Sequence, residues 1–419
     1  MTTDPTRPTP LPVRLLLSLL RSKALLATAA LGASGLALAC GNLILARVLP
    51  EAEFARFALI FSIVMIGIST GPIGADVVLA RRKFSPDAKL HRQVFVTSAL
   101  TSVVLVVIAG VAYPLRSALL ISVFVSIVAG GIKTVAVAHY RSHERFGFAL
   151  MLTVSTNASV LVASVLTLLL HGDSAILPAV AMSISLCLTA MLGWRAIAKP
   201  SLETEAVAGY SWGEGLSAVS FSGAGAILIA LDRLVIPHLL GLAQVATFSV
   251  LATIAGSPFQ MLQLGVGYTL LPALRNAPSA ARRRQLFVHE ALVVGATCLA
   301  ASVAVWVATP FILEWVLPGR YKISRSLLLA AIGVGTLKVL ASLVAATVNA
   351  LGSSVELARL SVIGWISIGV ALLGAVVGAR WGLTGVVYGV GLGWAFRAVA
   401  ISWLAIPHLH SDLINRDLK

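Results

Sequence analysis

Long apolar runs separated by short polar or basic segments dominate the chain from about residue 24 to residue 405. Most of the runs reach about 20 residues, the length at which an α-helix crosses a bilayer. They are too long for barrel strands, and in lipid a helix satisfies its own backbone hydrogen bonds. We therefore predict an all-α polytopic membrane protein with about twelve spans. The predicted spans are 24–46, 55–79, 93–112, 117–138, 147–170, 175–194, 214–236, 244–270, 287–309, 326–348, 358–378 and 384–405.

Composition supports the same interpretation. Hydrophobic residues make up 58% of the 419 residues and charged residues only 11%, whereas a soluble domain carries roughly a quarter charged residues. The chain therefore lacks the polar surface of a water-facing globule, and the spans leave no room for a soluble catalytic domain. The net charge of +15 comes from short basic clusters between apolar runs, which argues against nucleic-acid binding.

Lys and Arg are distributed unequally between alternate connections. Of the 31 Lys and Arg residues, well over half fall on one side of the membrane if the N-terminus is cytoplasmic. Inner connections carry such an excess of positive charge. We therefore predict that both termini lie in the cytoplasm.

The longest inner connection, 195–213, falls near the middle of the chain. It predicts a cytoplasmic linker between two six-helix lobes, 24–194 and 214–405. Residues 43–63 also align with residues 234–254, which suggests a parallel repeat; in so apolar a chain the match can also arise by chance. Outside the lobes we expect a disordered, basic tail at 1–23 and a cytoplasmic tail at 406–419.

Ionisable residues inside spans are costly in lipid and are therefore candidates for function. Lys338 lies near the centre of its span, and Arg397 lies more than half a span deep. Both are candidates to face a cavity and bind an anion, because Arg binds phosphate as a fork and Lys as a point charge. Asp76, Lys133, Glu214 and Glu290 lie closer to the inner ends of their spans, where snorkelling to the interface is an alternative. The adjacent Asp232 and Arg233 lie near the outer end of their span and either pair with each other or face a cavity.

Glycine and proline interrupt the second span of each half. The first interruption lies around Gly67 to Gly74 and the second around Gly256 to Gly267. Paired interruptions in corresponding spans indicate a transport path, although glycine also permits close helix packing. We find no Gly-rich loop ending in Gly-Lys-Ser/Thr for phosphate binding. We expect no enzymatic activity, no cofactor and no metal site.

The stretch from Asn42 to Phe54, followed by Phe57-Ala-Leu, resembles the opening of bacterial polysaccharide flippases. These belong to the multidrug/oligosaccharidyl-lipid/polysaccharide (MOP) exporter superfamily. In them an Ala-Arg-x-Leu-Gly stretch leads to an acidic-Phe-Gly turn; here Pro50 and Ala55 replace the usual glycines. Asp232-Arg-Leu-Val-Ile and the stretch 240–248 are similar to the corresponding pattern of the second half.

The resemblance implies two six-helix lobes around a central cavity. It also implies that a polyprenyl-pyrophosphate-linked oligosaccharide moves from the inner to the outer leaflet by alternating access, for surface polysaccharide biosynthesis. Helices one, two, seven and eight line the family's cavity, which adds Arg47 and Arg233 to Lys338, Arg397 and Lys133 as substrate-binding candidates. Asp76, Asp232 and Glu214 are candidates to bind a coupling ion. The implied location is the bacterial inner membrane, and the implied partners are the lipid bilayer, a glycan polymerase and export machinery.

Two other functions remain open. One is a cation-coupled multidrug antiporter of the same superfamily, which would place acidic residues at mid-helix positions; here the mid-span charges are basic. The other is a glycan polymerase or ligase, for which the outer connections are short. The glycan, the energy source and the oligomeric state are not specified by the sequence.

Overall fold

The computed structural model describes residues 23–82, 86–143, 145–197 and 210–410. Within these ranges the chain is helical and forms no strand. The two predicted tails, apart from Lys23 and residues 406–410, and residues 198–209 of the predicted linker lie outside the described residues. The helices are α2 (Lys23–Val48), α3 (Glu51–Thr70), α4 (Ala75–Arg82), α5 (Ala88–Ala112), α6 (Ser117–Ser142), α7 (Phe146–Leu169), α8 (Ile176–Ile197), α9 (Trp212–Leu240), α10 (Leu242–Leu251), η1 (Ala252–Gly256), α11 (Ser257–Arg275), α12 (Ala280–Phe311), η2 (Ile312–Val316), α13 (Arg325–Leu351), α14 (Ser354–Gly378), η3 (Ala379–Trp381) and α15 (Gly382–His410).

The predicted spans are confirmed as helices of membrane-crossing length. The described chain contains 11 stretches long and apolar enough to cross a bilayer. The last of them, Val355–His410, contains two helices, α14 and α15. They meet at Gly382, whose positive φ of 68° turns the chain. The all-α fold with about twelve spans is therefore correct, and the protein is a multi-pass membrane protein.

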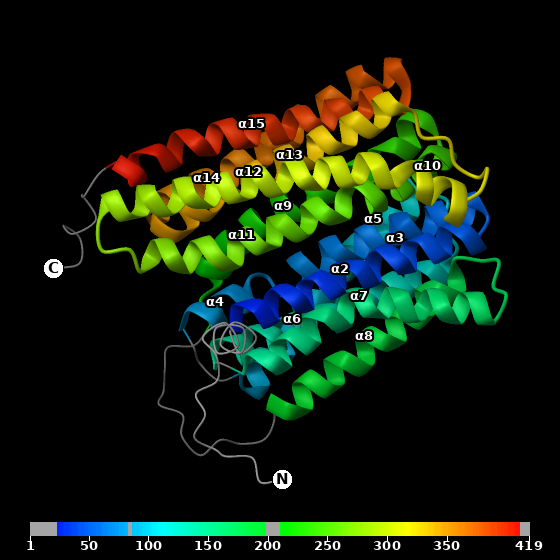
Figure 1. Cartoon of the computed structure of the whole chain (residues 1–419). Coiled ribbons are helices and arrows are strands. Elements are labelled where there is room, and N and C mark those ends of the chain that lie inside the picture. Colours follow the sequence, from blue (N-terminus) through cyan, green and yellow to red (C-terminus); the bar gives the residue numbers. More distant parts are fainter. Residues whose placement is uncertain (1–22, 83–85, 144, 198–209, 411–419) are drawn as a thin grey trace, which may run out of the picture.

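The helices form two lobes (Figure 1). In one lobe α2 packs on α7, and α6 packs on α5, α7 and α8. In the other, α13 and α14 pack on α15, and α11 packs on α13. The beginning of α2 and the end of α15 lie at the same end of the bundle (Figure 1). We call this end the inner end, following the predicted orientation, and the opposite end the outer end.

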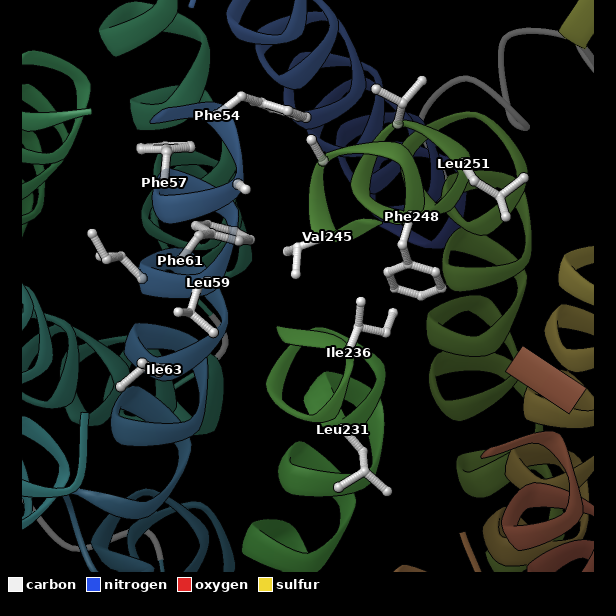
Figure 2. Packing of buried hydrophobic residues seen from close by; sticks show 14 of the residues in the cluster. Phe54, Phe57, Leu59, Phe61, Ile63, Leu231, Ile236, Val245, Phe248 and Leu251 are labelled. Atoms are coloured by element: carbon white, nitrogen blue, oxygen red, sulfur yellow. The ribbon is translucent and has the colours of Figure 1, made fainter. Parts of the chain in front are cut away.

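The lobes meet where α3 packs against α9 and α10. Figure 2 shows apolar side chains from these three helices converging on one another. Those labelled are Phe54, Phe57, Leu59, Phe61 and Ile63 on α3, Leu231 and Ile236 on α9, and Val245, Phe248 and Leu251 on α10. Phe54, Phe57 and Leu59 are completely buried. Removal of this apolar surface from lipid and water gives the lobes a continuous interface.

The aligned segments of the two halves occupy the same place in their lobes. Pro50 breaks the chain between α2 and α3, and the aligned residue Gly241 breaks it between α9 and α10. Phe57 and its counterpart Phe248 both belong to the main buried cluster. The first outer hairpin of each half is therefore in register, as the repeat predicts.

The second span of each half is interrupted, at different depths; the first interruption lies where predicted, whereas the second lies at Ala252–Gly256, before most of the predicted stretch from Gly256 to Gly267. α3 ends at Thr70, and Ile73 (φ 46°) and Gly74 (φ 70°) turn the chain into α4. In the second half the π-helix η1 begins after only ten residues of α10. At 1.5 Å per residue, η1 lies about 15 Å from the start of its span and the Gly74 turn about 30 Å. Only η1 is at mid-membrane depth, and π-helical segments occur frequently at functional sites.

Candidate transport cavity

The first cavity lies in the second lobe, among α9, the α10–η1–α11 helix, α13 and α15. It has a volume of about 90 Å³. Asp232 and Arg233 of α9 and Lys338 of α13 line it, together with the amides Gln260 and Gln263 of α11. Ala252 and Gly256 of η1 form part of the same wall. The structure thus brings three of the predicted charged residues together beside the π-helix.

The charges of this first cavity are partly compensated within it. Asp232 is 2% exposed and interacts electrostatically with Lys338 and with its neighbour Arg233. Arg233 reaches across the lobe interface, where its Nη1 donates to Ser62 Oγ of α3 at 3.5 Å. A buried charge is tolerated only when it is paired or hydrogen-bonded. The Asp232 carboxylate therefore offsets part of the positive charge of Lys338 and Arg233.

The second cavity adjoins the first and is lined by α9, α11, α13 and α15. Its volume is about 220 Å³, and Ile229 and Gln263 line both cavities. Arg397 of α15 lies in its wall, with its guanidinium carbon 5.6 Å from the centre of the Trp394 ring and 5.8 Å from that of Phe221. The Lys338 ammonium lies 5.5 Å from the same Trp394 ring. Trp394 therefore contacts the cations of both cavities.

Both cavities lie within the second lobe, whereas a central cavity between the lobes was expected. The reason is that the mid-span charges lie on α9, α13 and α15, and that α15 packs on both α13 and α9. Lys133 lies in the first lobe, where it is buried and donates to Thr156 of the neighbouring helix α7. It lines neither cavity.

The remaining candidates lie near the membrane ends. Arg47 is exposed at the end of α2. Asp76 is half-buried in the first turn of α4, and Glu214 is exposed in the first turn of α9. None of these three lines the two cavities. Their proposed roles stay predictions, because the structure brings them together with neither Lys338 nor Arg397.

Sequence reasoning missed Phe221, one of the two aromatic partners of Arg397. Trp394 precedes Arg397 by three residues, so helical spacing places the two on the same face and gave an available signal. Phe221 lies far away in sequence, and no local pattern connects it with Arg397. Gln263 and Asn349 also line the second cavity, and Gln263 was visible only as a polar residue in an interrupted span.

Hydrogen bonds between the lobes gather at the outer end. Arg320, in the connection after η2, donates to the carbonyl oxygens of Arg47 and Leu49, the latter at 2.7 Å. The Tyr321 hydroxyl donates to the Ala46 carbonyl at 3.3 Å, and burial raises the pKa of Tyr321 to about 12. These groups occupy carbonyls that the end of helix α2 leaves free. The structure is therefore closed at its outer end.

The inner end carries a smaller contact. The Tyr210 hydroxyl donates to the Ile73 carbonyl at 2.7 Å, and Gly74 packs directly against the backbone of Gly215. In α11, toward this end, a Cβ added at Gly265 or Gly267 would meet no atom of the described neighbours within 4 Å. The second cavity, which Gly267 lines, therefore has free space on this side of the Arg397 guanidinium.

No protein-family model matches the chain, and no curated protein matches it significantly. Several solved structures match it. A multidrug resistance MATE family transporter of the MOP superfamily, in an inward-facing conformation, superimposes with a TM-score of 0.63 at 14% identity, over 90% of this chain and 94% of its own. The lipid II flippase MurJ, in an inward closed conformation, gives 0.65 at 12% identity over 92% and 89%.

A third match is the MATE multidrug transporter DinF-BH in complex with a ligand, with a TM-score of 0.59 at 16% identity over 96% of this chain and 98% of the other. At these identities the likeness establishes the fold and not the substrate. Nearly the whole chain takes part in each superposition. The chain therefore has the fold of the MATE and MurJ transporters of the MOP superfamily.

Proposed function

We propose that the protein is a flippase that moves a polyprenyl-pyrophosphate-linked oligosaccharide from the inner to the outer leaflet of the bacterial cytoplasmic membrane. Alternating access would carry the anionic headgroup through the cavities of the second lobe. A glycan polymerase and export machinery would take up the product on the outer side. The fold is compatible with this function and equally with multidrug transport, so the choice depends on the cavities.

The observation that carries the proposal is the sign of the charge along the two cavities. Arg233, Lys338 and Arg397 line them, against Asp232 as the one acidic residue among the described lining residues. A net positive, poorly hydrated cavity attracts a diphosphate and repels a lipophilic cation. Gln260, Gln263 and Asn349 supply amide N–H donors suited to the oxygen atoms of the headgroup.

Multidrug antiport is the second candidate, and one observation favours it. Asp232 Oδ1 is buried without a hydrogen-bond partner in the described structure, as expected of a carboxylate that binds a proton or a sodium ion. The same carboxylate interacts electrostatically with Lys338, however, and this lysine already supplies an opposite charge. A cationic drug would have to displace that lysine.

The two functions are separated by one reconstitution experiment. The full chain in liposomes is given either a fluorescent lipid-linked oligosaccharide or a lipophilic cationic rhodamine dye with a sodium or proton gradient. The flippase proposal predicts protein-dependent translocation of the glycolipid, measured by the access of a membrane-impermeant quencher, and no dye transport. Dye transport without glycolipid translocation would contradict the proposal and support the antiporter.

A further inference from the structure

The second cavity contains hydrogen-bond donors without acceptors. Arg397 is 7% exposed and Trp394 2% exposed. The Arg397 Nη1 and the Trp394 Nε1 atoms are both buried and have no hydrogen-bond partner in the described structure. Buried donors are nearly always paired in proteins, so two unpaired donors three residues apart on one helix require an explanation.

We propose that Arg397 and the Trp394 indole form a binding site for a phosphate group, in the cavity that adjoins the Asp232–Lys338–Arg233 cluster. In the substrate named above, on which this assignment rests, the phosphate belongs to the lipid-linked diphosphate. Arg397 supplies the charge and a forked pair of N–H donors, which suit phosphate oxygens. The Trp394 N–H supplies a further donor, because indole nitrogen donates and never accepts.

No acidic side chain lines this cavity among the described residues. Its polar lining beside Arg397 consists of Gln263, Ser342 and Asn349, and the Ser342 hydroxyl is already engaged with the Lys338 carbonyl. Arg397 thus lacks the kind of counter-ion that Lys338 has. A ligand that brings negative charge is the missing partner.

The aromatic rings hold the guanidinium in position without satisfying its hydrogen bonds. Arg397 lies over both Trp394 and Phe221, and a cation over a ring face is attracted by the ring's quadrupole. Gly225 of α9 faces the guanidinium, with the Arg397 Nη atoms 3.8 and 3.9 Å from the position that a Cβ would occupy. The site is therefore preorganised, with α9 packed closely beside the guanidinium at Gly225.

The size of the cavity selects the part of the substrate that enters it. Its 220 Å³ is several times the space that one water molecule needs, which is enough for a phosphate or diphosphate. An oligosaccharide does not fit. The glycan would therefore lie outside this site, toward the inner end, while the diphosphate is held at Arg397.

The site is tested on the full chain in lipid nanodiscs, with inorganic diphosphate as the probe and calorimetry as the readout. Arg397→Met should weaken binding at least about 30-fold, as truncation of a buried charged partner does. Trp394→Phe keeps the ring and removes the N–H, and should weaken binding about tenfold. The matched control is Arg380→Met, which removes an exposed arginine of η3 that lines neither cavity; it should bind within about threefold of wild type.

Unchanged binding in Arg397→Met, or an equal loss in Arg380→Met, would overturn the site. A prenyl diphosphate distinguishes the source of the phosphate. Tighter binding of the prenyl form, again lost in Arg397→Met, identifies a lipid headgroup, and binding no tighter than that of inorganic diphosphate would overturn the lipid assignment. Diphosphate binding at Arg397 in a protein that translocates no glycolipid would overturn the proposed function and keep the site. Translocation with unaltered diphosphate binding in Arg397→Met would overturn the site and keep the function.

Discussion

Replacement of Arg397 by methionine should stabilise the protein when no ligand is bound. Methionine keeps an unbranched apolar side chain of similar reach, and the change removes a buried charge whose Nη1 has no acceptor. Leaving a buried polar group unpaired costs about 1–3 kcal/mol, and more for a charged group. The desolvation of an unpaired ion adds several kcal/mol.

Two contacts offset part of this cost. The stacking of the guanidinium on Trp394 and Phe221 contributes about 0.5–2 kcal/mol each, and the substitution removes both contacts. The balance is a gain of about 1–3 kcal/mol in the free energy of unfolding for Arg397→Met. Removal of a structural arginine with paired donors would instead destabilise the protein by a similar amount.

The assay is thermal unfolding of the full chain in one detergent, with and without diphosphate. Arg397→Met should unfold at a higher temperature than wild type without ligand, and diphosphate should raise the unfolding temperature of wild type alone. Lys338→Met is the contrasting variant, because it leaves the Asp232 carboxylate buried without its counter-ion and should destabilise. If Arg397→Met unfolds at a lower temperature than wild type, Arg397 is structural and the reasoning about orphan donors is wrong.

The remaining predictions concern the two ends of the lobe interface. Arg320→Ala removes the donors to the α2 carbonyls and should favour opening of the outer end by about 1–3 kcal/mol, which spin-label distances across that end would measure. The neighbouring Lys322→Ala should leave these distances unchanged, and equal shifts in both variants would contradict the role of Arg320. Gly74→Ala places a Cβ 2.5 Å from the Gly215 carbonyl oxygen at a positive φ, and should lower the stability in a thermal unfolding assay by about 2 kcal/mol or more. The control Gly213→Ala adds a Cβ that has nothing within 4 Å, and should cost little. Burial raises the pKa of Tyr321 to about 12, above its unfolded value of about 10. The contribution of the neutral phenol to stability should therefore be complete below pH 10 and lost between about pH 10 and 12. A Tyr321→Phe variant should lack this alkaline loss, and a pH profile identical to that of wild type would refute the role of the phenol.

Much of the fold could be predicted because lipid imposes one secondary structure. The twelve apolar runs gave helices, and the alignment of residue 50 with residue 241 placed the first outer hairpin of each half correctly. The depth of the second interruption could not be derived. Glycine and proline occur from Gly256 to Gly267, but the π-helix forms N-terminal to most of them, at Ala252–Gly256, where tertiary packing against α13 decides the backbone.

The candidate site was only partly visible in the sequence. The depth of Lys338 and Arg397 within their spans identified them as cavity residues, since charge in lipid is costly. The sequence did not show that Lys338 has an acidic neighbour and that Arg397, among the described residues, has none. The neighbour, Asp232, lies more than a hundred residues before Lys338 and interacts with it only in the folded lobe. Lys133 illustrates the converse: it was a cavity candidate by the same reasoning, and a single hydroxyl from Thr156 holds it inside the first lobe.

The central claim is that the protein translocates an anionic glycolipid through the positively charged cavities of its second lobe. The most direct measurement compares the rate of lipid-linked oligosaccharide translocation in liposomes that contain equal amounts of wild type or Arg397→Ala. The account predicts protein-dependent translocation by wild type and a loss of at least about 30-fold in Arg397→Ala, with both proteins folded and inserted. Equal rates for the two proteins, or no translocation by wild type, would contradict it.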